Sequence, residues 1–306
     1  MAARYNLQAL YPNQPSLWGS YDQKKTDKLR DEHSDLYARP KFANLLNAQA
    51  IISLHTNADK QNGTGMRAVY QTGRMEDKKL GDTILCHAQE IINAQEHYKN
   101  YSVQKSSDVY DKAENQAAIN RSAIIVETGF HTNPTDAQAL QDPLFVTAAM
   151  KGIEKGYRLY REGKTDCTPY QISNATHPTI AWGVKGVIHL SYRGYPQSLE
   201  GYPVQAVTLQ MRCISGALCQ IGAMTVTNLT DPHITLACPP YDPTSPAPRT
   251  TTIGYSLIDA DQVKTPEIQQ FFTCGSSAVT PSHLATSAQR SQRQPQPFVL
   301  NGALAE

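Results

Sequence analysis

The chain has 306 residues, which is enough for two domains of ordinary size. Its 28 lysines and arginines nearly balance its 27 aspartates and glutamates, and the net charge of +1 excludes proteins that bind nucleic acid or anionic membranes through general electrostatic attraction. No apolar run reaches the roughly 18 to 20 residues that span a bilayer, and the start of the chain lacks the apolar stretch of a signal peptide, so we expect no transmembrane segment and no export signal in this sequence.

Charged side chains are unevenly distributed along the chain. Residues 1–165 hold 40 of the 55 charged side chains, whereas residues 166–306 hold only 15. The second part is rich in Thr, Ser, Pro, Val and Ile, and it carries five of the six cysteines. The sequence therefore predicts two structurally different halves that join near residue 165.

The first half alternates helical and strand patterns. Helices are expected over about 40–47 and 79–96 and from Pro143 onward, because apolar residues there recur at spacings of three and four. The short apolar runs at 50–54 and 123–126 are typical of strands that are buried on both faces. Alternating strands and helices predict an α/β domain with a mostly parallel sheet flanked by helices.

A polar residue directly follows each of the two apolar runs. His55 follows the first run and Glu127 follows the second. Because ligands of open α/β sheets bind beyond the carboxyl ends of the strands, we expect both side chains to face one crevice. An imidazole is a common zinc ligand, and a carboxylate beside a metal-bound water is the usual general base for hydrolysis. The pair predicts part of a metallohydrolase site; the alternatives are a hydrogen-bonded structural histidine and a glutamate that caps a helix or pairs with an arginine.

Two longer segments carry a specific resemblance. Residues 31–58 contain Arg39, then Ala43-Asn44, then a strand ending in Ser53-Leu54-His55-Thr56-Asn57, and residues 123–145 read AIIVETGFHTNPTDAQALQDPLF. In this order they resemble the two signatures of zinc-dependent N-acetylmuramoyl-L-alanine amidases of the amidase-3 type. The helix containing residues 152–157 looks like the closing helix of that family. The resemblance covers about residues 30–161 and implies an amidase fold that lacks its first strand region.

The resemblance implies zinc-dependent hydrolysis of the amide between N-acetylmuramic acid and L-alanine in peptidoglycan. Such a protein is expected in the periplasm, in the cell wall or outside the cell. By the same resemblance, His55 binds the metal, and Glu127 takes a proton from the attacking water and delivers it to the leaving amine. Asn57 is expected to hold the loop or a substrate group by hydrogen bonding.

The sequence departs from the family at the remaining metal ligands. A catalytic zinc normally has three protein ligands, and the family takes two of them from a Gly-His-Gly-Gly loop and from the start of the next helix. Neither motif is present, and residues 1–29 contain no His and no Glu. Glu32 and His33 are expected in a loop, and the loop pattern around His131 argues against a ligand role. Two interpretations stay open: the sequence lacks its true beginning, which we favour, or the chain is a pseudoenzyme that binds wall glycopeptide without cleaving it.

The second half contains short segments rich in Val, Ile, Thr, Tyr and Leu, separated by Gly, Pro, Asn or Asp. These segments lie at 182–192, 202–213, 223–228, 233–238, 250–257 and 269–274. Their number and spacing predict an antiparallel β-sandwich of immunoglobulin-like type. We expect a structural or binding module for a wall or surface partner. A third hypothesis gives the biological role to this module alone, as an adhesive or scaffolding protein.

The cysteines of the second half favour an oxidising compartment, because they include no Cys-x-x-Cys pair. We expect disulfides between Cys213 and Cys219 and between Cys238 and Cys274, with Cys167 left over. Cys86 in the first half is expected to be a small buried side chain. The alternative is a set of buried free thiols in a cytosolic protein.

These patterns predict five segments. They are an atypical segment at 1–29, an amidase-like domain at 30–162, a linker at 163–178, a β-sandwich at 179–275 and a tail at 276–306. The tail is rich in Ser, Gln, Pro and Ala with little periodicity, which predicts disorder.

Overall fold

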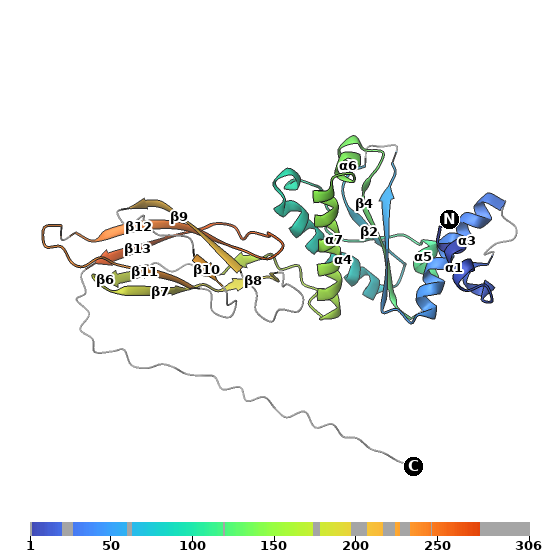
Figure 1. The fold of residues 1–306 in the computed structure, drawn as a ribbon, viewed down its shortest axis with the longest axis horizontal. Helices are drawn as coiled ribbons and strands as arrows, with labels where there is room; N and C mark the ends of the chain where they lie inside the picture. The colour runs from blue at the N-terminus through green and yellow to red at the C-terminus, as the bar shows by residue number, and fades with distance from the viewer. Residues whose placement is uncertain are drawn as a thin grey trace, which may run out of the picture.

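A computed structural model describes residues 2–19, 27–59, 63–118, 120–173, 178–196, 207–216, 224–226, 233–245 and 247–275. Figure 1 shows a helix-rich α/β half joined to a β-rich half. The predicted change of architecture along the chain is therefore observed. Within the described residues, no helix is both long enough and apolar enough to cross a membrane. The predicted tail and Cys219 lie outside the described residues.

The sheet of the first half has the strand order β1-β4-β2-β3. These strands span Ala50–Asn57 (β1), Ser122–Phe130 (β4), Arg67–Tyr70 (β2) and Asp108–Val109 (β3). Strand β4 pairs in parallel with β1 and antiparallel with β2, and β2 pairs in parallel with β3. The sheet is thus mixed, although two of its three pairings are parallel as predicted. Because β4 is central, its apolar residues Ala123, Ile124, Ile125 and Val126 are buried.

Helices α4 (Met75–Ala94) and α7 (Pro143–Arg161) pack against each other on one side of this sheet (Figure 1). Asp142 caps α7 by accepting a hydrogen bond from the backbone N–H of Leu144, and Pro143 occupies the first turn, as predicted. The two helices come so close that a Cβ on Gly152 would lie 2.3 Å from the Cα of Ala88. Only a glycine permits this approach, which brings α4 and α7 together as one layer of the core.

The amino-terminal helices lie on the other side of β1 (Figure 1). They are α1 (Ala2–Leu10), α2 (Pro15–Trp18) and α3 (Asp27–Leu45). The predicted helix at 40–47 is the end of a longer helix, and the predicted loop around Glu32 and His33 is wrong, because α3 continues through Pro40 as a single helix. Tertiary contacts hold the turns before the proline: the backbone N–H of Arg4 donates to Asp35 at 2.9 Å, and Ala38 is fully buried. Packing here outweighs the cost of an internal proline.

Short helices complete the first half. They are the single-turn helix η1 (Glu96–Tyr98), α5 (Ala113–Gln116) and α6 (Pro134–Ala139). Asn133 caps α6 by accepting from the backbone N–H groups of Thr135 and Asp136. The carboxylate of Asp136 accepts in turn from the backbone N–H groups of Gly65 and Phe130, at 2.7 and 2.9 Å. These bonds fix the end of β4 to the segment that precedes β2.

The second half is built almost entirely of strands. They are β5 (Gln171–Ile172), β6 (Thr179–Ala181), β7 (Lys185–His189), β8 (Tyr192–Arg193), β9 (Val207–Gly216), β10 (Met224–Val226), β11 (His233–Ala237), β12 (Arg249–Ile258) and β13 (Ile268–Gly275). The largest sheet has the order β10-β9-β12-β13-β6, and β11 pairs with β7 and β5 with β8. All pairings except that of β13 with β6 are antiparallel. The β-rich character is confirmed, and the immunoglobulin-like sandwich stays a prediction.

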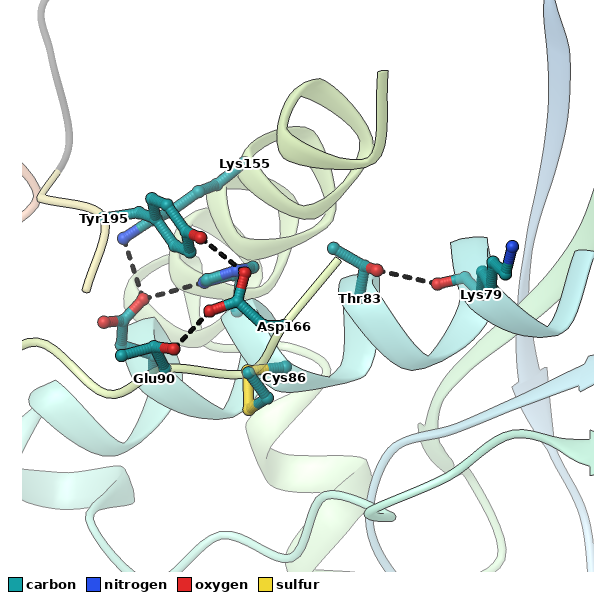
Figure 2. Close-up of a disulfide and its surroundings, with 10 residues drawn as sticks. Lys79, Thr83, Cys86, Glu90, Lys155, Asp166 and Tyr195 are labelled. Carbon is teal, nitrogen blue, oxygen red and sulfur yellow. Dashed lines mark hydrogen bonds and ion pairs between the residues drawn. A yellow bond between two sulfur atoms is a disulfide. The ribbon is translucent and has the colours of Figure 1, made fainter. Parts of the chain in front are cut away.

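The two halves are joined by covalent and ionic contacts. A disulfide links Cys86 on α4 to Cys167 (Figure 2). The prediction that Cys167 is left over is therefore wrong, and Cys86, predicted to be a small buried side chain, is its half-buried partner. Lys151 on α7 forms an ion pair with Asp261 of the β-rich half at 2.8 Å. One apolar cluster runs from Ile84 and Phe145 through Tyr170 to Tyr255 and Phe272, without a break between the halves.

The predicted disulfide between Cys238 and Cys274 is confirmed. Cys213 is also disulfide-bonded, and its predicted partner Cys219 lies outside the described residues. The Cys86–Cys167 bond was missed because it joins the halves across 81 residues, and cysteine connectivity cannot be deduced from sequence alone.

Candidate active site

Three polar side chains form a row across three neighbouring strands. His55 on β1 is in register with Glu127 on β4, and Glu127 is in register with Arg67 on β2. Side chains at paired positions of adjacent strands point to the same face of a sheet. The structure thus brings together His55 and Glu127, which the sequence placed at one crevice. Both lie inside strands that extend beyond the apolar runs, to Asn57 and Phe130.

Glu127 is held by two neighbours. The Nδ2 atom of Asn57 donates a hydrogen bond to Oε2 of Glu127 at 2.5 Å, and Nε of Arg67 lies 3.6 Å from the same oxygen. The guanidinium of Arg67 also binds the carboxylate of Asp108 at 2.7 Å. The Glu127 side chain is 14% exposed, so its carboxylate is oriented by the protein and still accessible from solvent. Asn57 therefore contacts Glu127 directly, a contact that the sequence did not predict.

His55 faces a second carboxylate. Its Nε2 atom lies 2.9 Å from Oε2 of Glu114, which α5 carries. The two atoms are close but not aligned as a hydrogen bond. The other carboxylate oxygen of Glu114 accepts from Arg39 at 2.7 Å, and Arg39 also reaches Asp35 at 3.2 Å. The side chains of Glu114 and Asp35 are both 4% exposed, so two buried carboxylates and the partly exposed Arg39 form an ionic network next to His55.

Glu114 was missed in the sequence. Helix α5 has only four residues, too few for a helical apolar pattern to be recognised. The available signal was indirect: Arg39 belongs to the first signature, and its guanidinium can pair with a carboxylate. Nothing in the sequence connects position 39 with position 114, because that contact is made only in the folded chain.

The described residues do not fit a catalytic zinc site. Among them, no group of three or more His, Cys, Asp or Glu side chains could hold a metal ion, whereas a catalytic zinc needs three protein ligands. The carboxylate nearest to His55 is already neutralised by Arg39. His131 belongs to no such group either, and its Nδ1 lies 3.0 Å from the hydroxyl of Thr56. Glu32 and His33 lie on α3 instead of in a loop.

A cavity of about 210 Å³ opens beside Glu127. It is lined by Asn57, Arg67, Val69, Tyr110, Lys112 and Glu127. The lining combines one carboxylate, two cationic side chains, an amide and an aromatic ring. Such a site can bind a polar ligand and move a proton at the Glu127 carboxylate.

Residues 21–158 match the model of a protein family described as N-acetylmuramoyl-L-alanine amidase. The match contains His55, Asn57, Glu114 and Glu127. It ends within α7, before the β-rich half begins. No curated protein is similar enough to this chain to count as a relative.

Several solved structures are similar to part of this chain. The CwlD amidase of Clostridioides difficile, solved with the GerS lipoprotein, is 19% identical with a TM-score of 0.39; the similarity covers 47% of this chain and 69% of that one. An N-acetylmuramoyl-L-alanine amidase from Clostridium difficile 630 is 24% identical with a TM-score of 0.37, over 42% of this chain and 66% of that one. The catalytic domain of CwlV from Bacillus (Paenibacillus) polymyxa is 17% identical with a TM-score of 0.36, over 53% and 82%.

Proposed function

We propose that this chain acts on the amide bond between N-acetylmuramic acid and L-alanine in peptidoglycan, because residues 21–158 match the model of the N-acetylmuramoyl-L-alanine amidase family. One observation carries the proposal. Glu127 lies on the central strand in register with His55, is oriented by Asn57, and lines an open cavity. A positioned, accessible carboxylate is the group that amide hydrolysis needs for proton transfer.

In this proposal Glu127 acts as base and then as acid. Its carboxylate accepts a proton from the water whose oxygen attacks the carbonyl carbon of the lactyl group. The C–N bond then breaks, and Glu127 returns the proton to the nitrogen of L-alanine, so the products are a muramic acid carboxyl group and a free amine. Asn57 and Arg67 keep the carboxylate in one orientation during both transfers.

Zinc enters this proposal only as an expectation from the family. It would polarise the carbonyl and activate the water, and His55 is the residue that the resemblance assigns to it. The described residues supply no set of three ligands, so we assign no step of the reaction to a metal.

A substitution of Glu127 tests the proposal. The full chain and Glu127→Gln are incubated with purified peptidoglycan, and newly exposed L-alanine amino groups are quantified by labelling and mass spectrometry. We expect release by the native chain and a loss of at least about a hundredfold in Glu127→Gln, since a positioned acid–base group contributes about 10²–10⁴-fold. Glu96→Gln is the matched control, because the Glu96 side chain is 81% exposed. Equal release by the Glu127 and Glu96 variants would contradict the assignment.

A second candidate function is binding of wall glycopeptide without cleavage. The observation that favours it is the close pairing of His55 with Glu114, together with the missing three-ligand set among the described residues. This function predicts that the native chain binds muropeptides and releases no L-alanine amino groups. Elemental analysis of the purified chain then shows less than one zinc per ten chains.

We propose that the protein acts outside the cytoplasmic membrane, where peptidoglycan lies. The disulfides support this proposal, because such bonds persist in oxidising compartments. Among the described residues no cysteine is free. A fractionation experiment that detects the protein, with its disulfides formed, outside the membrane is the expected result.

A further inference from the structure

Lys112 is a cation in the cavity that forms no ion pair with any residue that the structure describes. It immediately precedes α5, and its Nζ atom lies 4.2 Å from the ring centroid of Tyr110. Both side chains line the cavity that contains Glu127. Within the described parts of the chain, no carboxylate forms an ion pair with Lys112. The electrons of the Tyr110 ring hold the ammonium in place without neutralising it.

The other cation of the cavity is already engaged. Arg67 binds Asp108 at 2.7 Å and lies 3.6 Å from Glu127. It balances carboxylates of the protein, whereas Lys112 is available to an anion of the ligand. The Lys112 ammonium is therefore a separate positive charge beside the row of His55, Glu127 and Arg67, and it lies near β3 and α5.

We propose that Lys112 binds a carboxylate of the stem peptide, on the residue that follows L-alanine. The inference rests on the proposed function and adds a specificity determinant to it. At about 210 Å³ the cavity is smaller than the roughly 300–1,000 Å³ of pockets for drug-sized ligands, so it fits one peptide residue better than a glycan strand. In stem peptides that residue carries either a free carboxylate or a carboxamide, and Lys112 selects the charged form.

Tyr110 increases the preference of Lys112 for a carboxylate over a carboxamide. Its ring is 54% exposed and gives the ammonium an apolar wall on one side, which reduces the competition from water. A charged hydrogen bond in such a partly shielded place is stronger than an ion pair between freely solvated side chains. A carboxamide at the same place gains no comparable interaction, because it carries no net charge.

The test compares two ligands that differ only in this group. N-acetylmuramoyl-L-alanyl-D-isoglutamate and its isoglutamine counterpart, each with the γ-carboxyl group blocked as a methylamide, are titrated calorimetrically into the full chain. Every chain carries Glu127→Gln, so that no ligand is cleaved. We expect the carboxylate ligand to bind about tenfold more tightly, which corresponds to about 1.4 kcal/mol. In Lys112→Gln this ratio falls to about one, and in Lys112→Arg it is retained.

Further measurements separate the outcomes. Lys99→Gln is the matched control: the Lys99 side chain is 58% exposed and pairs with Glu96, and this change leaves the ratio at about ten. Thermal melting checks that each variant is folded. The inference is overturned if the Glu127→Gln chain binds both ligands with equal affinity, or if the ratio of the two affinities is unchanged when Lys112→Gln is added. Either result leaves the proposed function intact. Failure of both ligands to bind contradicts the proposed function itself.

Discussion

His55 and Glu114 approach each other within 2.9 Å, Nε2 to Oε2, although they are 59 positions apart in the chain. Glu114 also binds Arg39, so one buried carboxylate joins a strand, a short helix and the long helix α3. Through these two contacts, Glu114 holds β1 and α3 next to each other at the site. It also leaves the imidazole next to a carboxylate that is already paired.

This relationship predicts that Glu114 stabilises the fold. Glu114→Gln keeps the shape of the side chain but removes the charge that pairs with Arg39 and His55. We expect the free energy of unfolding to fall by about 1–3 kcal/mol, the usual cost of losing a partner of buried polar groups. Urea denaturation at neutral pH measures the change.

The exposed Glu96 again supplies the control, and Glu96→Gln is expected to change stability by no more than about 0.5 kcal/mol. If Glu114→Gln is as stable as this control, the network around His55 does not support the fold.

The Cys86–Cys167 disulfide should be the larger covalent contribution to stability. It closes a loop across 81 residues, whereas Cys238–Cys274 spans 36. The loop-entropy relation gives about 4.5 kcal/mol for the first bond and about 3.8 kcal/mol for the second. Replacing both members of one pair by serine and measuring chemical denaturation tests each value, with the other pair as the comparison. Unchanged stability of Cys86→Ser/Cys167→Ser would refute the prediction.

A buried ionic cluster beside that disulfide predicts a dependence of stability on pH (Figure 2). Glu90 accepts from the fully buried Lys155 at 2.7 Å and contacts His87 at 3.0 Å. Burial opposes the charged form of Glu90, but the contacts with His87 and Lys155 outweigh it, and the pKa of Glu90 is lowered from its ordinary value of 4.5. A lowered pKa in the folded chain means that stabilisation is complete above the unfolded pKa and is lost as the pH falls through the folded one.

We therefore expect the melting temperature to fall as the pH decreases below about 4.5. Glu90→Gln should be less stable at neutral pH, because it leaves the Lys155 ammonium buried without a countercharge. It should also lose less stability between pH 5 and pH 3 than the native chain, over a range where both are still folded. Melting curves across this range measure both effects, and parallel pH profiles of the two proteins would contradict the role of Glu90.

In the first half, local sequence patterns correctly predicted the elements whose buried residues form a recognisable apolar run or repeat. The runs at 50–54 and 123–126 are in β1 and β4, and Pro143 starts α7. The two signatures predicted the amidase family, and both lie within residues 21–158, which match the model of that family. Each signature is a short run of neighbouring residues, so it can be recognised without any knowledge of the fold.

Contacts between distant segments could not be predicted in this way. Glu114 becomes part of the site only because α5 packs beside α3, and Cys167 finds its partner only because the chain returns to α4. Helix α3 was predicted too short because a proline normally ends a helix, and only packing around Ala38 and Asp35 shows otherwise. The roles of His55, Asn57 and Glu127, the domain boundaries and the partner of the β-rich half stay predictions.

The uninterrupted apolar cluster that contains Phe145, Tyr170 and Tyr255 affects how the chain can be divided. Cutting the polypeptide near residue 165 would uncover apolar surface on both fragments, and each fragment would tend to aggregate through it. A fragment ending there would also lose the partner of Cys86. The activity of an isolated first half would then reflect damaged packing as well as missing residues, so single substitutions in the whole chain are the more informative experiments.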